Sequence, residues 1–421
     1  MSEATATAER RVPSLPGIDH TLGLWFDPYR FIGSACRTAG SDVVQARFLG
    51  RRTLCMTGAA TAEIFYDKSL FQRAGAAPEP ARATLFGKGG VQGLDGEAHL
   101  QRKRFFLQAT SPQRVQQLAL EAEAQWMRLA PQWQRAGRFS LYEATQHWLT
   151  RSVCGWAGVP LDDAEEPVRT RHLVALFDKA ASGLAAHWQA RRARYHAEAW
   201  LAALVEQARA GRGVFREGSV AHEAAMLVNG HDAPLEPRIA AVELLNVLRP
   251  TVATSLYIVH SAHALQGHPW LRDALRGGGE AAMHSFAQEV RRFYPFFPAL
   301  AARVREDFVW NGFRFPRGTR VMLDIYGTNR DPRRWEHPDE FQPQRFVGHA
   351  PGRFDFIPQG GSTAESDHRC PGEGVVLALM ELALRLLLRA NYHVPAQDLE
   401  IRMDRMPAIP ASGFVIERFT A

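Results

Sequence analysis

Helical sequence patterns dominate the middle of this chain of 421 residues, from Gly96 to about residue 293. Apolar residues recur there at the spacing of one helix face, which predicts helices over 139–156, 164–184, 185–210, 235–265 and 281–293. Ser111-Pro112 predicts another helix start, because serine caps helices and proline suits the first helical position. One more helix is predicted over 371–390. The chain is therefore expected to fold around a large helical body.

Short β elements are predicted on both sides of this helical run. Residues 42–57 are typical of a hairpin with a turn at Gly50, residues 308–315 of strands around an Asn311-Gly312 turn, and 320–325 of a further strand. Residues 331–361 are rich in proline, glycine and aromatic side chains without a helical period, and such long irregular segments are usually functional. No repeat or linker divides the sequence. We therefore predict a single domain over residues 1–421, mainly α with small β elements.

Charge and cysteine content exclude several classes of protein. The 50 basic and 44 acidic residues give a net charge of +6, spread along the chain without a basic stripe between aromatics, which argues against a nucleic-acid partner. Four cysteines without a Cys-x-x-Cys pair argue against a disulfide framework or a zinc knuckle. The polar start of the chain predicts no signal peptide and no membrane anchor, and the apolar run at 375–388 is interrupted by Glu381 and Arg385. A cytoplasmic protein is expected.

One cysteine stands in a loop whose surroundings give it chemical meaning. Cys370 follows a glycine-rich segment that begins at Phe356, and it directly precedes the predicted helix over 371–390. The positive end of a helix stabilises a thiolate, which is the form of cysteine that ligates metals. His368 and Arg369 beside it are cations that could meet carboxylates. An isolated cysteine is more often a small buried apolar residue, so the interpretation depends on the rest of the pattern.

The cysteine loop resembles the haem-thiolate loop of the cytochrome P-450 superfamily. Three further segments match that family in the right order: Asp95-Gly96-Glu-Ala-His99, Glu289-Val-Arg-Arg292 and Pro343-Gln-Arg345-Phe346. Glu-x-x-Arg alone is most often a solvated helix pair, but the whole set is specific and covers essentially the entire chain. The resemblance implies the single-domain cytochrome P-450 fold. Haem b (heme b) would be buried between a long central helix and the cysteine loop, with Cys370 as the axial ligand of its iron.

The same resemblance assigns structural and cofactor-binding roles. Glu289, Arg292 and Arg345 would form a buried triad behind the haem, because a buried carboxylate needs arginine forks to satisfy its oxygens. The haem propionates would be met by His99, Lys103, Arg303, His368 and Arg369. His99 and Lys103 are four residues apart and share one helix face. The alternative for His99, Lys103 and Arg303 is an ordinary solvated surface charge.

Two features depart from the usual monooxygenases of this family. Fourteen positions separate Phe356 from Cys370, about twice the usual spacing. The central helix reads Arg249-Pro250 and lacks the family's acid–threonine pair, which delivers protons to bound dioxygen. A proline disrupts the helix ladder, and an arginine on an apolar helix is costly unless it is paired. Arg249 either pairs with a carboxylate of the protein, or it faces the haem and awaits the carboxylate of a substrate, which its fork can bind bidentately.

Arg249-Pro250 and the extended loop resemble the bacterial fatty-acid peroxygenase branch of the family. The resemblance implies hydroxylation of a long-chain fatty acid at Cα and Cβ by hydrogen peroxide, without an obligatory redox partner. The substrate carboxylate on Arg249 would replace the missing acid–base pair, and Pro250 would belong to the same catalytic segment. Phe86 and Gln92 would lie above the haem near the first carbons of the substrate, with glutamine favouring hydroxylation over minor decarboxylation to terminal alkenes. Their alternatives are a core aromatic and a polar loop residue.

Three other functions stay open at this point. A hydroperoxide-rearranging haem-thiolate enzyme also dispenses with dioxygen activation, although its chemistry needs no carboxylate beside the iron. A reductase-dependent monooxygenase is disfavoured by the missing acid–threonine pair. A haem sensor or carrier would bind the cofactor and form no product.

Overall fold

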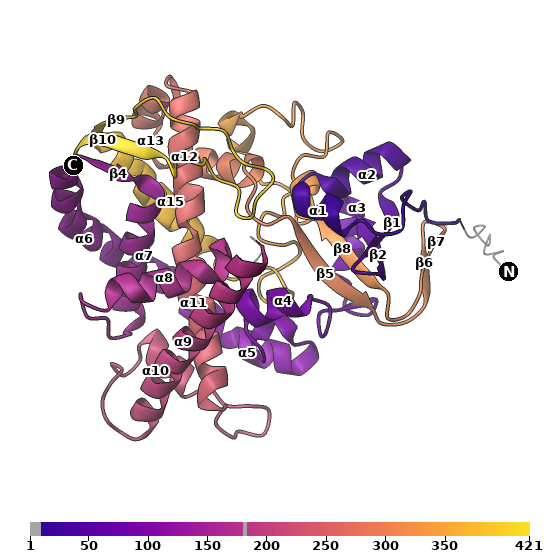
Figure 1. Ribbon diagram of the computed structural model, residues 1–421, viewed down its shortest axis with the longest axis horizontal. Coiled ribbons are helices and arrows are strands. Elements are labelled where there is room, and N and C mark those ends of the chain that lie inside the picture. The colour runs from indigo at the N-terminus through magenta and orange to yellow at the C-terminus, as the bar shows by residue number, and fades with distance from the viewer. Residues whose placement is uncertain (1–9, 180–182) are drawn as a thin grey trace. The chain divides into compact units, whose positions relative to one another are not determined.

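The computed structural model of the protein describes residues 10–179 and 183–421, which fold into two compact units. Unit 1 comprises Met1–Pro78, Phe297–Pro338 and Pro351–Arg369. Unit 2 comprises Glu79–Phe296, Asp339–Ala350 and Cys370–Ala421. Each unit therefore draws on segments that are far apart in the sequence (Figure 1).

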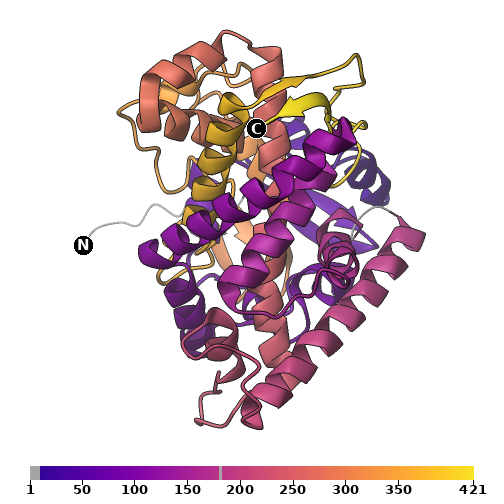
Figure 2. The ribbon, with the colours of Figure 1, turned by 90° about the vertical axis from the view of Figure 1, so that its left-hand side faces the viewer.

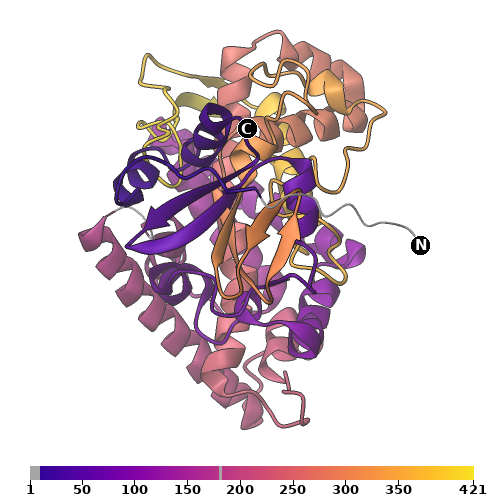
Figure 3. The ribbon, with the colours of Figure 1, turned by 90° about the vertical axis from the view of Figure 1, so that its right-hand side faces the viewer.

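Unit 1 is built on a five-stranded sheet, which Figure 3 shows within this unit. The strands lie in the order β1 (Val43–Phe48), β2 (Arg51–Met56), β8 (Arg320–Asp324), β5 (Ala299–Val304) and β3 (Phe71–Gln72). Only β2 and β8 pair in parallel. The unit also holds the hairpin of β6 (Phe308–Trp310) and β7 (Phe313–Phe315), and helices α1 (Thr21–Phe26), α2 (Phe31–Ala39), α3 (Ala59–Phe65) and α14 (Ile325–Thr328). Apolar side chains of β2 and β8, such as Leu54 and Leu323, form part of its core.

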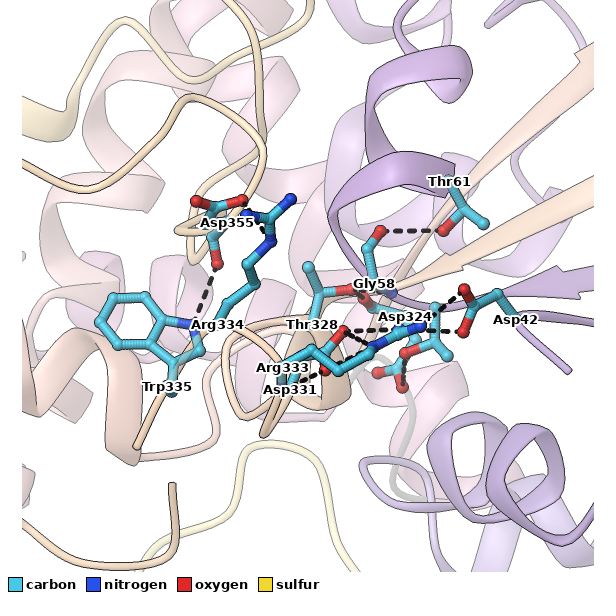
Figure 4. A network of polar contacts seen from close by, with 11 residues as sticks. Asp42, Gly58, Thr61, Asp324, Thr328, Asp331, Arg333, Arg334, Trp335 and Asp355 are labelled. Atoms are coloured by element: carbon cyan, nitrogen blue, oxygen red, sulfur yellow. Dashed lines mark hydrogen bonds and ion pairs between the residues drawn. The ribbon is translucent and has the colours of Figure 1, made fainter. Parts of the chain in front are cut away.

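A polar network fastens the end of β8 to its neighbours in unit 1 (Figure 4). The buried carboxylate of Asp324 caps α14, accepting the Gly327 N–H at 2.8 Å and the Thr57 hydroxyl at 3.2 Å. Arg333 donates to both Asp42 and Asp331. Burial raises the pKa of Asp324 to about 7, in spite of these hydrogen bonds.

Unit 2 is mainly helical, and Figure 2 shows α6 and α7 toward the viewer with α11 and α12 in succession behind them. Its first segment forms α4 (Glu79–Ala81), η1 (Arg82–Phe86), η2 (Val91–Gly93), α5 (Gly96–Ala109), α6 (Pro112–Ala136), β4 (Arg138–Ser140), α7 (Leu141–Ala157), α8 (Glu166–Asp178), α9 (Leu184–Arg209), α10 (Val220–Ala225), α11 (Pro237–Ala253), α12 (Ser255–Gly267) and α13 (Leu271–Phe293). The later segments add η3 (Pro343–Phe346), α15 (Glu373–Arg389), β9 (Asn391–His393) and β10 (Val415–Thr420). Strands β4, β10 and β9 form a small antiparallel sheet.

Helix α11 runs through the core of unit 2. From Ala240 to Ala253 all of its residues except Pro250 are buried, against helices that include α7, α9 and α10. The stretch Pro237–Gly267 is long and apolar enough to cross a membrane, but 89% of its most apolar window is buried inside the protein. That burial is what the core helix of a folded domain shows.

The predicted fold class and several of its elements are confirmed. The chain is mainly helical with small sheets, the 42–57 hairpin is formed by β1 and β2, and Asn311 and Gly312 turn the 308–315 hairpin with φ of 48° and 81°. Both positive φ values are those that a two-residue hairpin turn requires.

Three details of the predicted helices are wrong. The single helix over 235–265 is divided into α11 and α12 at Thr254, four residues after Pro250. The helix over 164–184 ends at Asp178, Leu184 begins α9, and residues 180–182 lie outside the described part of the chain. Ser111 precedes α6, but its side chain makes no capping hydrogen bond. The helix start predicted at Ser111-Pro112 is nevertheless confirmed, because α6 begins at Pro112 and the Val115 N–H donates to the Ser111 carbonyl.

Candidate functional site

Cys370 lies three residues before the start of α15 in unit 2. It is partly exposed, whereas Cys36, Cys55 and Cys154 are buried. Burial of the sulfur raises the pKa of Cys370, the charge of Glu373 adds to this, and the Gly372 N–H with the charges of Lys103 and Arg291 opposes it. In the protein without a bound metal ion, desolvation therefore outweighs the effect of the helix start. A coordinated metal ion would reverse the balance, since metal binding deprotonates a thiol outright.

Buried cations accompany Cys370 within unit 2. His99 and Lys103 are buried residues of α5, and Lys103 lies close enough for its charge to lower the pKa of Cys370. Arg291 of α13 is buried too, and its Nη2 lies 2.9 Å from Oε1 of Glu373 in the first turn of α15. Buried cations next to a thiol suit a metal-bearing group that carries negative charge.

The extended loop that leads to Cys370 belongs to unit 1 and is organised by Asp367. Its carboxylate accepts hydrogen bonds from the hydroxyls of Ser362 at 2.7 Å and Thr363 at 3.1 Å, and it pairs with Lys68 at 2.8 Å. Burial raises the pKa of Asp367, but Lys68 and the hydroxyls together hold it below its usual range. Near the end of the loop, the Arg369 guanidinium donates to the Ser362 carbonyl at 3.2 Å. The additional loop residues thus form an ordered turn.

The remaining predicted cofactor residues of unit 1 are His368 and Arg303. His368 is partly exposed at the end of the loop. Arg303 of β5 lies opposite Arg320 of β8, and the Nε atoms of both are buried without a hydrogen-bond partner among the described residues. Two neighbouring guanidinium groups with unsatisfied donors fit an anionic group, such as the carboxylates that a haem carries.

The structure brings Glu289, Arg292 and Arg345 together in unit 2. Both arginine and carboxylate of the Glu289–Arg292 pair are fully buried, and two hydrogen bonds of 2.7 Å join them. Arg345 adds a contact of 3.3 Å to Oε1, and the Gln342 N–H donates to the same oxygen at 2.8 Å. The Arg292 guanidinium also donates to the Glu340 carbonyl at 3.0 Å. This arrangement ties α13 to the 340–345 segment and leaves no group free for chemistry with a substrate.

Arg249 lies on the buried face of α11 and is 8% exposed. Its Nε has no hydrogen-bond partner, and no carboxylate in residues 10–179 or 183–421 forms an ion pair with it. Burial lowers the pKa of Arg249 to about 9, the charge of Arg194 adds to this, and the charge of Cys370 opposes it. Of the two interpretations from the sequence, pairing with a protein carboxylate is therefore not what the structure has. Arg249 is a buried cation whose donors are available to an anion.

Pro250 follows Arg249 inside α11. Because proline has no N–H, the carbonyl of Asn246 one turn earlier loses its helical hydrogen bond. The helix nevertheless continues to Ala253, helped by the Thr251 hydroxyl, which donates to the Val247 carbonyl at 2.9 Å. Pro250 thus loosens the helix ladder directly beside Arg249.

Phe86 and Gln92 lie on the segment that precedes α5. Phe86 ends η1, and Gln92 lies in η2, where its side-chain oxygen accepts a hydrogen bond of 3.2 Å from Asn246 of α11. Gly90 makes this approach close, since a Cβ on it would lie 3.0 Å from Nδ2 of Asn246. The Gln92 side chain is thus held against the same helix that carries Arg249.

Sequence reasoning did not find Arg194, which holds the other end of this segment. Its guanidinium is buried on α9, pairs with Glu198 at 2.6 Å, and lies 3.5 Å from the carbonyl oxygens of Thr84, Leu85 and Phe86. Gly87 allows this approach, because a Cβ there would overlap the Arg194 guanidinium. The available signal was the Arg–Glu pair four residues apart on a predicted helix, but such pairs are usually solvated.

Comparison with known proteins places the chain in a family. The cytochrome P450 (P-450) family profile matches residues 283–412. The Mycobacterium bovis protein named cytochrome P-450 138 is 26% identical over 336 residues, which is 74% of each chain. The solved structure of cytochrome P450SP alpha (CYP152B1) in complex with (R)-ibuprophen is 48% identical, with a TM-score of 0.94 over 96% of this chain and 99% of that one. Cytochrome P450EX alpha (CYP152N1) with myristic acid is 37% identical, with a TM-score of 0.94 over 97% and 99%.

The chain therefore belongs to the cytochrome P-450 family and has its fold. Within that family it is similar to the CYP152 proteins, as the resemblance to the peroxygenase branch predicted. It is an oxidoreductase whose cofactor is haem b with an axial cysteine thiolate. Within unit 2 the residues present fit that group, since a partly exposed cysteine lies close to the buried Lys103 and Arg291.

Proposed function

We propose that the protein hydroxylates long-chain fatty acids at Cα and Cβ with hydrogen peroxide as the oxidant, with decarboxylation to terminal alkenes as a minor outcome. The observation that carries this proposal is Arg249, a buried guanidinium with an unpartnered Nε on the helix where the usual monooxygenases have an acid–threonine pair. The neighbouring CYP152N1 structure with myristic acid supports a fatty acid as the substrate class.

The residues of this chain would hold the cofactor as follows. Cys370 would ligate the iron through its thiolate, with Lys103 close enough to stabilise that charge. His99, Lys103, Arg303, His368 and Arg369 would meet the propionates, and the Glu289, Arg292 and Arg345 triad would hold the surrounding backbone. The haem supplies the iron at which peroxide is split, and its thiolate ligand favours cleavage of the O–O bond.

Arg249 would bind the substrate carboxylate and keep it ionised. A guanidinium fork gives a carboxylate two parallel hydrogen bonds, which fixes its orientation. The bound carboxylate would then accept a proton from one peroxide oxygen and return it to the other, so that the substrate serves as its own acid–base catalyst. Pro250, which leaves a gap in the helix ladder at this point, would belong to the same segment.

Position selectivity would follow from where the carboxylate is held. A carboxylate fixed on Arg249 brings Cα and Cβ nearest to the oxidant, so that proximity decides which C–H bond reacts. Phe86 and Gln92 would line the space beside these carbons, on the segment that Arg194 and Asn246 hold in place. No redox partner would be needed, and we place the reaction in the cytoplasm, within a single functional domain.

The test is an incubation of the haem-loaded protein with myristic acid and hydrogen peroxide, without NADPH or a reductase, followed by mass spectrometry of the products. We expect 2-hydroxy and 3-hydroxy acids, and their loss in Arg249→Ala. Absence of product from a protein with intact thiolate-ligated haem would overturn the proposal and favour a hydroperoxide-rearranging or reductase-dependent enzyme.

A further inference from the structure

A chain of buried polar groups leads from α5 across α11 to Gln92. Arg102 of α5 donates to Oε1 of Glu243 on α11 at 2.5 Å. Asn246, one helical turn further, donates from Nδ2 both to Oε2 of Glu243 at 3.0 Å and to Oε1 of Gln92 at 3.2 Å. Glu243 is fully buried and Asn246 is 6% exposed, so these hydrogen bonds are shielded from water.

The contact between Arg102 and Glu243 fixes which groups donate and which accept in the other hydrogen bonds of this network. Burial raises the pKa of Glu243, but the Arg102 guanidinium and the Val91 N–H both donate to it and so hold it as an acceptor. An acceptor facing Asn246 requires the NH2 end of that amide and not its oxygen. The second hydrogen of the same NH2 group is then donated to Gln92, whose side-chain oxygen accepts it. The NH2 group of Gln92 is consequently left over, without a hydrogen bond to any of the residues described.

We propose that Glu243 and Asn246 are positioning residues that orient the Gln92 amide so that it presents its NH2 group to the substrate. This rests on the proposed function, in which a fatty-acid carboxylate and its first carbons lie beside Gln92. A donor there attracts the carboxylate and adds to its binding by Arg249. The opposite orientation would turn the Gln92 oxygen toward the same carboxylate and repel it.

Two observations indicate that this network of hydrogen bonds has a role other than packing. The Oδ1 atom of Asn246 is buried without a hydrogen-bond partner in the described part of the protein, which is a cost that an apolar residue at this position would avoid. Gly90 lets the Gln92 segment approach α11, because a Cβ on Gly90 would lie 3.0 Å from Asn246 Nδ2 and 3.2 Å from Gln92 Oε1. The close contact between the Asn246 and Gln92 amides therefore depends on a glycine at position 90 and leaves the Asn246 oxygen unsatisfied.

The experiment measures the dissociation constant of myristic acid for the haem-loaded protein, together with the ratio of 2-hydroxy to 3-hydroxy product. Gln92→Leu and Asn246→Leu are each expected to weaken binding about fivefold, as the loss of one hydrogen bond does. Glu243→Gln, whose amide can face Asn246 either way, is expected to weaken binding in the same direction. Glu243→Asp, which keeps the acceptor, should recover most of it.

The double variant Gln92→Leu/Asn246→Leu decides between positioning and a merely structural role. If Asn246 acts through Gln92, the double variant binds no more weakly than Gln92→Leu alone, and both shift the product ratio alike. If the two effects multiply, the positioning role is wrong. Thr145→Val is the matched control, because it removes a buried hydroxyl on α7 that bonds only within its own helix.

The failure of the underlying function would look different. If Arg249→Leu binds myristic acid as tightly as the unaltered protein, the carboxylate does not dock there, and the role of Gln92 toward it fails for that reason. If Arg249→Leu weakens binding while Asn246→Leu leaves both the dissociation constant and the product ratio unchanged, only the positioning role of Glu243 and Asn246 is overturned.

Discussion

Replacing Arg249 by leucine should make the protein more stable while it abolishes fatty-acid binding. Burial lowers the pKa of Arg249 from the ordinary arginine range to about 9, so the folded protein holds this cation at a cost. At about 1.36 kcal/mol per pKa unit, that cost is about 5 kcal/mol at neutral pH. Because the folded pKa lies below the unfolded value, the cost is fully present below pH 9 and disappears as the pH rises toward the ordinary pKa of arginine.

Packing losses at the new side chain reduce the gain. Replacement of a buried ion pair by apolar residues of similar volume is often neutral or stabilising by about 1–4 kcal/mol, and we expect Arg249→Leu, which removes an unpaired buried charge, to stabilise the protein within that range. The measurement is the thermal midpoint of the haem-loaded protein by circular dichroism. Arg194→Leu is the matched control with the opposite expected sign, because the buried Glu198 then keeps only its ion pair with the exposed Arg238.

Myristic acid should raise the thermal midpoint of the unaltered protein and leave that of Arg249→Leu unchanged, which reverses their order wherever the gain from Arg249→Leu is below about 2.7 kcal/mol. A ligand at one hundred times its dissociation constant stabilises the folded state by about 2.7 kcal/mol, and only the protein with Arg249 can gain this from the carboxylate. A lower thermal midpoint for Arg249→Leu without fatty acid would refute the view of Arg249 as an unpaired buried cation. An equal upward shift of both proteins by myristic acid would refute the docking of the carboxylate.

Three further predictions concern stability and the Gln92 segment. Arg292→Leu leaves the fully buried Glu289 carboxylate without its main partner and should cost about 3–5 kcal/mol, seen as a lower thermal midpoint and faster haem loss; an unchanged midpoint would contradict the buried pair. Asp324, with a folded pKa of about 7 against 3.8, should make stability fall by about 4 kcal/mol as the pH rises from 4 to 7, and Asp324→Asn should flatten that slope in urea titrations. Gly90→Ala should push the loop from Asn246 and change the ratio of 2-hydroxy to 3-hydroxy product, while an unaltered ratio would show that the close approach does not matter.

The parts of the site that could be predicted from the sequence are those in which a residue type is tied to a local backbone requirement. Cys370 is recognisable because glycines precede it and a long apolar helix follows. Arg249-Pro250 is recognisable because both residues are costly in an apolar helix. The Asn311-Gly312 turn is recognisable because both residues tolerate positive φ.

The parts that could not be predicted depend on partners that only the folded chain brings together. From the sequence, Arg194 and Glu198 would be interpreted as a solvated ion pair on one helix. In the folded protein α9 packs on the segment that carries Phe86, and this packing buries Arg194. In the sequence, Asn246 and Glu243 are two polar residues of an apolar helix. Only the folded chain brings Arg102 to Glu243 and Gln92 to Asn246, and these contacts fix which group donates and which accepts. The burial that raises the pKa of Cys370 could not be predicted for the same reason, because desolvation is a property of the surrounding fold and not of the adjacent helix start.

The measurement that tests the central claim most directly compares myristic acid with its methyl ester as substrates of the haem-loaded protein, with hydrogen peroxide as the only oxidant. The two substrates share the same chain, and only the acid has a carboxylate that can bind Arg249 and carry a proton. The account predicts 2-hydroxy and 3-hydroxy products from the acid and no turnover of the ester at the same peroxide concentration. Equal hydroxylation of the ester at Cα and Cβ would contradict the role of the substrate carboxylate.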